Sequence, residues 1–126
     1  MGSMGNPSIL AIERDWRLRR LIRANLEVLG LKVCEAADGQ QGLNLMQANR
    51  PDLILLDLDL VEEEGPQLLA ELHTLHGRPV PILLLGAEPP SRSLIQQEGV
   101  AGYLQKPFAV PALLEQVQRA LNGAGA

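Results

Sequence analysis

Short apolar runs alternate with longer amphipathic segments along the chain. Five runs have the length and composition of strands: 9–12, 32–36, 53–56, 79–85 and 103–104. Five segments with apolar residues at helical spacing follow them: Asp15–Leu29, the stretch from Asp38-Gly39 to the break at Pro51, the stretch that Gly65-Pro66 opens, Ser91–Glu98 and Val110–Leu121. Runs 9–12, 53–56 and 79–85 are apolar on both faces, as in a parallel sheet covered by helices on both sides. Because such crossovers are right-handed, the pattern predicts a doubly wound α/β domain with a five-stranded parallel sheet and five helices.

Some individual side chains can also be placed from the pattern. The predicted inner faces of the first and third helices consist of apolar residues: Leu18, Leu21, Ile22, Leu26 and Leu29, and then Leu68, Leu69, Leu72 and Leu75. His73 is expected to be exposed near a helix end, and Cys34 to pack as a small apolar residue on its strand.

Composition narrows the class of protein. The chain of 126 residues suits one domain, predicted at 8–122, and the near absence of aromatic residues implies an aliphatic core. Met1-Gly2-Ser3 ahead of Met4 suggests a cloning remnant, so 1–7 is expected to be disordered and 123–126 to be a tail or the start of a linker. The net charge of −4 gives no reason to expect direct nucleic-acid binding. The single cysteine and the lack of a membrane-length apolar run suggest a cytoplasmic protein without membrane contact.

Polar residues gather where the predicted strands end. In a doubly wound sheet, function sits at the carboxyl ends of the strands. The residues at those ends are Glu13, Arg14, Asp15, Asp57, Asp59, Gly86 and Lys106. No glycine-rich phosphate loop, nucleophile elbow or Cys/His metal spacing is present in the sequence. Carboxylates that face a lysine could hold Mg²⁺, or one aspartate could accept a phosphoryl group. Charged residues also mark where strands leave a core, but that simpler interpretation is the weaker one for the whole set.

These residues resemble the receiver domain of two-component response regulators. The likeness covers about Ser8 to Leu121, through "ILAIERD", "LILLDLDLVEEEG", "PILLLGAE" and "GYLQKPF". The resemblance implies the flavodoxin-like strand order 2-1-3-4-5, which places Glu13 beside Asp57. It also implies that Asp57 is the phosphoacceptor, that Lys106 contacts the phosphoryl group through a loop with a cis Lys106-Pro107 bond, and that Glu13 belongs to the metal-binding acidic pair. Tyr103 would be the aromatic that moves on activation.

Two departures from the family's pattern bear on mechanism. Arg14 stands where the resemblance implies a second acidic residue, the direct Mg²⁺ ligand. Gly86 stands where it implies a hydroxyl side chain that binds the phosphoryl group and couples it to the switch aromatic, Tyr103. Repulsion between a guanidinium and Mg²⁺ at ~4–5 Å would cost roughly a few kcal/mol at an effective dielectric near 20. We therefore expect weak or absent Mg²⁺ binding, with Glu13 and Asp57 as the remaining metal residues. The side chain of Arg14 could act as an electrophile, or it could turn outward to Asp15 or to the acidic run Glu62–Glu64.

Three functions remain open from the sequence. The first is an atypical signalling receiver, not an enzyme, that acts through protein contacts with weak or absent phosphorylation at Asp57. The second is a conventional receiver that is switched by aspartyl phosphorylation with Mg²⁺. The third is a flavodoxin-like enzyme or ligand-binding domain. The resemblance implies a protein partner, namely a histidine kinase, a phosphotransfer protein or an output domain. A run of arginines on the first helix, at 14, 17, 19, 20 and 23, is either a solvated face or a docking surface.

Overall fold

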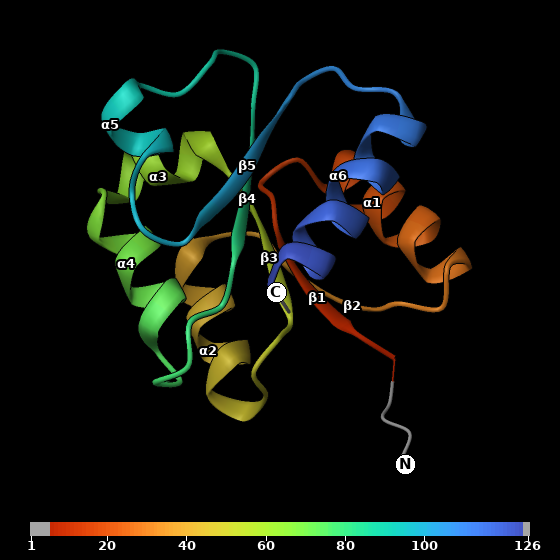
Figure 1. Ribbon diagram of the computed structural model, residues 1–126, viewed down its shortest axis with the longest axis horizontal. Coiled ribbons are helices and arrows are strands. Elements are labelled where there is room, and N and C mark those ends of the chain that lie inside the picture. Colours follow the sequence, from red (N-terminus) through yellow and green to blue (C-terminus); the bar gives the residue numbers. More distant parts are fainter. Residues whose placement is uncertain (1–5, 125–126) are drawn as a thin grey trace.

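The computed structural model describes residues 6–124 and shows one parallel sheet between two layers of helices (Figure 1). The strands are β1 (Ser8–Ile12), β2 (Lys32–Ala36), β3 (Leu53–Asp57), β4 (Ile82–Gly86) and β5 (Val100–Gln105). The helices are α1 (Trp16–Val28), α2 (Gly39–Ala48), α3 (Leu58–Glu64), α4 (Gln67–Thr74), α5 (Arg92–Ile95) and α6 (Val110–Ala124). All strand pairs are parallel, and the order is β2-β1-β3-β4-β5. The predicted fold class and strand order are therefore confirmed.

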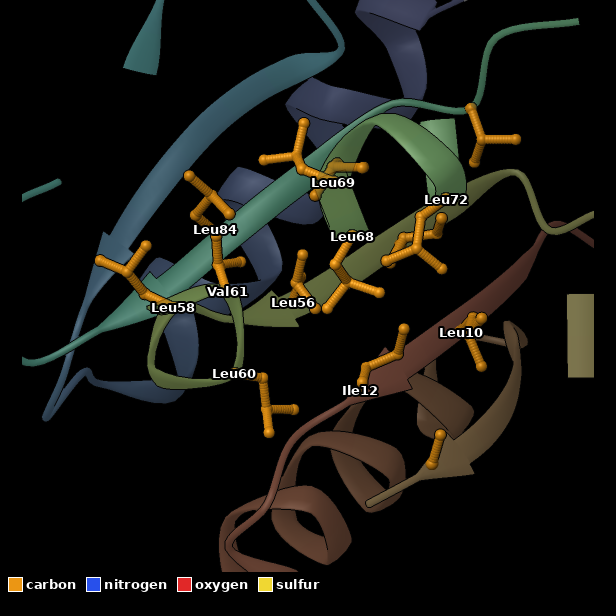
Figure 2. Packing of buried hydrophobic residues seen from close by; sticks show 14 of the residues in the cluster. Leu10, Ile12, Leu56, Leu58, Leu60, Val61, Leu68, Leu69, Leu72 and Leu84 are labelled. Atoms are coloured by element: carbon orange, nitrogen blue, oxygen red, sulfur yellow. The ribbon is translucent and has the colours of Figure 1, made fainter. Parts of the chain in front are cut away.

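The strands that are apolar on both faces contribute side chains to two separate hydrophobic cores, one on each face of the sheet. Successive residues of β1 point to opposite faces of the sheet, with Leu10 and Ile12 on one face and Ile9 and Ala11 on the other. Leu10 and Ile12 join the core beneath α2, α3 and α4, part of which is shown in Figure 2. Ile9 and Ala11 join the core beneath α1 and α6, which lie together on the other face (Figure 1). Burial on both faces explains why these runs contain no polar residue.

The helix after β3 was not predicted. The segment "LDLVEEE" continues the apolar run of β3, but from Leu58 it forms α3 instead. Asp57 causes the change, because its side chain accepts a hydrogen bond from the backbone N–H of Asp59 and so caps the helix. Leu58, Leu60 and Val61 then point into the core (Figure 2), while the exposed positions carry acids. The described residues 6–124 therefore form six helices where five were expected.

Several single-residue predictions were wrong. Leu21 on α1 is exposed, and so are Leu29 and Leu75, which lie just beyond the last residues of α1 and α4. Cys34 is exposed because β2 is an edge strand. His73 is buried, and its Nδ1 lies 2.9 Å from the carbonyl oxygen of Val80, so the ring links α4 to the approach to β4.

The ends of the domain differ slightly from the predicted boundaries. The backbone N–H of Lys32 donates to the carbonyl oxygen of Pro7, so the chain is held against β2 before residue 8. At the other end α6 continues to Ala124, which takes in two residues of the predicted tail 123–126. The remainder of the predicted leader and tail, 1–5 and 125–126, lies outside the described residues. No helix in the described range is both long and apolar enough to cross a membrane.

Candidate functional site

The register of the sheet brings three charged residues together at one edge. Ile12 pairs with Leu56, so the next residues, Glu13 and Asp57, leave neighbouring strands side by side. On the other side of β3, Gly86 pairs with Gln105, and Lys106 follows directly. Its backbone N–H donates to the carbonyl oxygen of Gly86 at 2.8 Å, and the Lys106–Pro107 peptide bond is cis, as the resemblance implied.

Asp57 is completely buried at the centre of the site. Its Oδ1 accepts from the backbone N–H of Asp59 at 3.0 Å and lies 3.5 Å from Lys106 Nζ. Its Oδ2 accepts a longer hydrogen bond, at 3.3 Å, from the backbone N–H of Arg14. Both oxygens therefore contact donors at the carboxyl end of the sheet.

The ion pair with Glu13 is the closer of the two that Lys106 forms. Lys106 Nζ lies 2.9 Å from Glu13 Oε1, while Glu13 Oε2 accepts from the backbone N–H of Asp15 at 3.0 Å. Burial raises the pKa of the Glu13 carboxyl, and the contacts with Lys106 and the Asp15 N–H oppose this effect. Burial alone would lower the pKa of the Lys106 ammonium, but the contacts with Glu13 and Asp57 outweigh it and raise that pKa. One lysine thus compensates two buried carboxylates.

Arg14 turns its side chain away from Asp57. Its guanidinium forms an ion pair with Glu63 on α3, and 44% of the Arg14 side chain is exposed. The sequence left two outward partners open for Arg14, namely Asp15 and the acidic run Glu62–Glu64, and in the structure the partner belongs to the acidic run. The side chain of Asp15 instead caps α1, where Oδ1 accepts from the backbone N–H of Arg17 at 3.0 Å. Asp59 is exposed in the first turn of α3, so its charge does not add to the buried pair.

The place of the expected hydroxyl is filled by a close contact. A Cβ on Gly86 would lie 3.0 Å from the Cβ of Leu58, so Leu58 would have to shift by a few tenths of an ångström to admit a side chain there. Tyr103 is half-buried, and its hydroxyl lies 2.7 Å from the carbonyl oxygens of both Gly86 and Glu88. The tyrosine thus holds the segment after β4 through backbone atoms, without a side-chain hydroxyl at position 86.

The donor set does not match a magnesium site built on three carboxylates. Within residues 6–124 no three His, Cys, Asp or Glu side chains form a group that could hold a metal ion. Glu13 and Asp57 are the two carboxylates present, and both already contact Lys106. Glu13 Oε1 is already paired with the Lys106 ammonium at 2.9 Å, and the adjacent position carries Arg14, which cannot act as a metal ligand.

The sequence did not indicate a role for Leu58, and it indicated Glu63 only as one member of the acidic run Glu62–Glu64. Leu58 packs against Gly86, and of the acidic run Glu63 contacts Arg14. Both belong to α3, so their positions could not be known without that helix. The signal was present in the capping aspartate followed by apolar residues at 58, 60 and 61.

The arginines of α1 are partly neutralised by a single residue of β2. Arg19 and Arg23 contact the carboxylate of Glu35 at 2.9 and 3.1 Å, and Arg20 lies at 4.0 Å. Arg17 has no carboxylate partner among the described residues, and its guanidinium lies 5.1 Å from the ring centre of Trp16. The remaining positive charge is therefore concentrated at the start of α1, close to Arg14.

Comparison with known proteins is consistent across sequence and structure. Residues 9–118 match the response regulator receiver domain. The KDP operon transcriptional regulatory protein KdpE of Escherichia coli is 32% identical over 115 residues, which cover 91% of this chain and 51% of KdpE. The DNA-binding dual master transcriptional regulator RpaA of Synechocystis is 36% identical over 119 residues, which cover 92% of this chain and 49% of RpaA. The chain spans about half the length of these two relatives.

A solved structure has the same fold as this chain over almost its full length. The chemotaxis response regulator CheY4 of Vibrio cholerae has a TM-score of 0.81 at 27% identity, and the match covers 91% of this chain and 98% of that one. The family match spans all five strands and the pocket formed by Glu13, Asp57 and Lys106. The chain therefore belongs to the response regulator receiver domains.

Proposed function

We propose that this chain is an atypical receiver domain that signals through protein contacts, with weak or absent Mg²⁺-dependent phosphorylation at Asp57. The observation that carries the proposal is Arg14 at the position of the second acidic residue. The pocket contains two buried carboxylates and one lysine, a formal charge of −1, and Arg14, which is paired with Glu63, supplies no third carboxylate. A divalent cation is attracted to surplus negative charge, and little surplus remains here.

A second observation concerns transmission of a signal. The resemblance assigns coupling to a hydroxyl after β4, but Gly86 has none and is packed against Leu58. Tyr103 binds the backbone carbonyl oxygens of that segment directly. A phosphoryl group on Asp57 would then have no side-chain hydroxyl to bind at position 86. This favours signalling by protein contact over a conventional phosphorylation switch.

The family suggests the kind of partner. Receiver domains act with a histidine kinase, a phosphotransfer protein or an output domain, and we propose one of these as the partner, in the cytoplasm. The relatives KdpE and RpaA are transcriptional regulators by name, and they are about twice as long as this chain. An attached DNA-binding output would be a property of such a longer protein; the net charge of −4 gives no reason to expect that this domain itself binds DNA.

The test is direct phosphorylation. The protein is incubated with acetyl phosphate, with and without Mg²⁺, and its intact mass is followed beside Asp57→Asn and a conventional receiver as positive control. We expect no appreciable adduct of about 80 Da, the mass of one phosphoryl group, under conditions that modify the control fully. A Mg²⁺-dependent adduct that is absent from Asp57→Asn would establish the conventional switch and refute the proposal.

A further inference from the structure

Arg14 combines two properties that suit it to binding an anion. Its backbone N–H donates to Asp57 Oδ2, so the residue is fixed at the rim of the pocket. Its guanidinium, however, has only one charged side-chain partner among residues 6–124, the carboxylate of Glu63, and both side chains are substantially exposed, at 44% and 55%. Exposed ion pairs of this kind contribute little stability, so the guanidinium can exchange partners at low cost.

The chemistry of the two cations fits a phosphoryl group. A guanidinium binds phosphate oxygens through two parallel N–H bonds, and it keeps its proton at all relevant pH values. Lys106 Nζ lies between Glu13 and Asp57, and the lysine side chain is 20% exposed, so the ammonium is placed beside a group carried by Asp57. Together these cations could compensate the charge that Mg²⁺ compensates in a three-carboxylate pocket.

We propose that Arg14 and Lys106 form a metal-independent site for a phosphoryl-type anion at Asp57, and that Glu63 controls it by competing for the Arg14 guanidinium. In the state described here Glu63 holds Arg14 outward. When an anion occupies the site, the guanidinium leaves Glu63 and turns inward, which also releases α3 from the loop after β1. This inference rests on the proposed function, because it assumes that Mg²⁺ does not fill the pocket.

The ion pair links two elements that both begin at the pocket. Arg14 lies in the loop between β1 and α1, and Glu63 lies near the end of α3, whose first turn is capped by Asp57. Exchange of partners would therefore change a contact between surface elements without involving a hydroxyl at position 86. This exchange would give the chain a structural response to a bound anion, although Gly86 provides no hydroxyl to transmit one.

The probe is beryllofluoride, a phosphoryl mimic, in buffer freed of Mg²⁺ and of all other divalent metals except the beryllium of the probe. Trp16, the only tryptophan, is 54% exposed two residues after Arg14, so its fluorescence reports binding, and backbone amide shifts of Asp57 and Asp59 locate it. Glu63→Gln removes the competing charge, and Glu62→Gln is the matched control, since Glu62 is exposed and forms no ion pair in the described part of the chain. Arg14→Gln removes the proposed ligand.

We expect metal-free wild type to bind beryllofluoride, and Glu63→Gln to bind it about two to five times more tightly, because an exposed ion pair competes only weakly for the guanidinium. Glu62→Gln should match wild type, and Arg14→Gln should bind at least about tenfold more weakly. Equal affinities for Glu63→Gln and Glu62→Gln, or no metal-free binding at all, would overturn the inference and leave the proposed function intact. Tight binding only after Mg²⁺ is added would overturn both.

Discussion

At the scale of single residues, Lys106 is the side chain on which the pocket depends. Its ammonium lies between Glu13 and Asp57, two carboxylates with almost no contact with water. Like charges in such a place repel, and each is poorly solvated, so a shared cation stabilises both. Loss of the lysine would leave two buried carboxylates facing each other.

We expect Lys106→Met to lower the free energy of unfolding by about 2 kcal/mol at pH 7. This is less than the 3–5 kcal/mol typical of a broken buried pair, because the ammonium is partly exposed. The matched control is Lys32→Met, which removes the only other lysine, exposed on the edge strand β2. Urea unfolding followed by circular dichroism measures both variants.

The loss of stability in Lys106→Met should also depend on pH, and the direction follows from the pKa of Glu13. Burial raises the pKa of Glu13, so its contribution to stability is fully present below about 4.5 and is lost as the pH rises through the raised value. Without Lys106, which opposes this rise, the pKa of Glu13 should increase further. The difference between wild type and Lys106→Met should therefore be small near pH 4 and largest near pH 7. A loss that is equal at both pH values would refute this account of the pair.

At the scale of elements, a buried histidine joins α4 to β4 and β5. His73 contacts the carbonyl oxygen of Val80, and its ring packs against Gly99, where the chain turns into β5 with φ at 98°. A Cβ at Gly99 would lie 2.5 Å from His73 Nδ1. Both the conformation and the space at this turn therefore require glycine.

Gly99→Ala should destabilise the domain by about 2–4 kcal/mol, which combines left-handed backbone strain with crowding of the ring. Gly77→Ala is a matched control, because Gly77 also has a positive φ, at 76°, but nothing lies within 4 Å of its Cβ position. It should cost only about 1–2 kcal/mol, the backbone part alone. If the two variants unfold at the same urea concentration, the histidine ring does not constrain this turn.

Tyr103 is the element-scale link between β5 and the segment after β4. Tyr103→Phe removes the hydroxyl that contacts the carbonyl oxygens of Gly86 and Glu88. We expect a loss of about 1 kcal/mol in stability and faster amide hydrogen exchange confined to residues 87–91. Unchanged exchange there would mean that the hydroxyl does not hold the segment.

Prediction from sequence succeeded where one physical pattern dominated. Strands such as 53–56 are apolar on both faces because both faces are covered, and that pattern belongs to no exposed element. Glu13, Asp57 and Lys106 could be predicted to meet because each follows a strand at the same edge of the sheet. The helix α3 was missed because its apolar residues directly continue the run of β3.

The orientation of Arg14 could not be predicted for a related reason. A long surface side chain follows its local partners, and Glu63 is a partner only because α3 presents it to the loop after β1. His73 was misplaced because its burial depends on the turn at Gly99, which is distant in the chain. Both errors arise from contacts between segments that periodicity does not reveal.

At the scale of the whole molecule, the charged pocket lies at the carboxyl ends of the strands, and the sheet separates it from the loops at their amino ends. Glu13, Asp57, Gly86 and Lys106 all lie at the carboxyl ends of parallel strands, with the loop that carries Arg14 beside them. Arg78 precedes β4 and so lies at the opposite edge of the same sheet. Identical charge changes at Arg14 and Arg78 therefore alter the net charge of the molecule equally, but only one of them alters the pocket.

The measurement that tests the central claim most directly is Mg²⁺ binding by Arg14→Asp, Arg78→Asp and wild type, followed by isothermal titration calorimetry. Arg14→Asp supplies a third carboxylate and removes a cation, so we expect its affinity for Mg²⁺ to exceed that of wild type at least about tenfold, or about 1.4 kcal/mol. Arg78→Asp, with the same change in net charge, should bind as weakly as wild type. The account would be contradicted if wild type bound Mg²⁺ as tightly as Arg14→Asp, or if both variants gained equally.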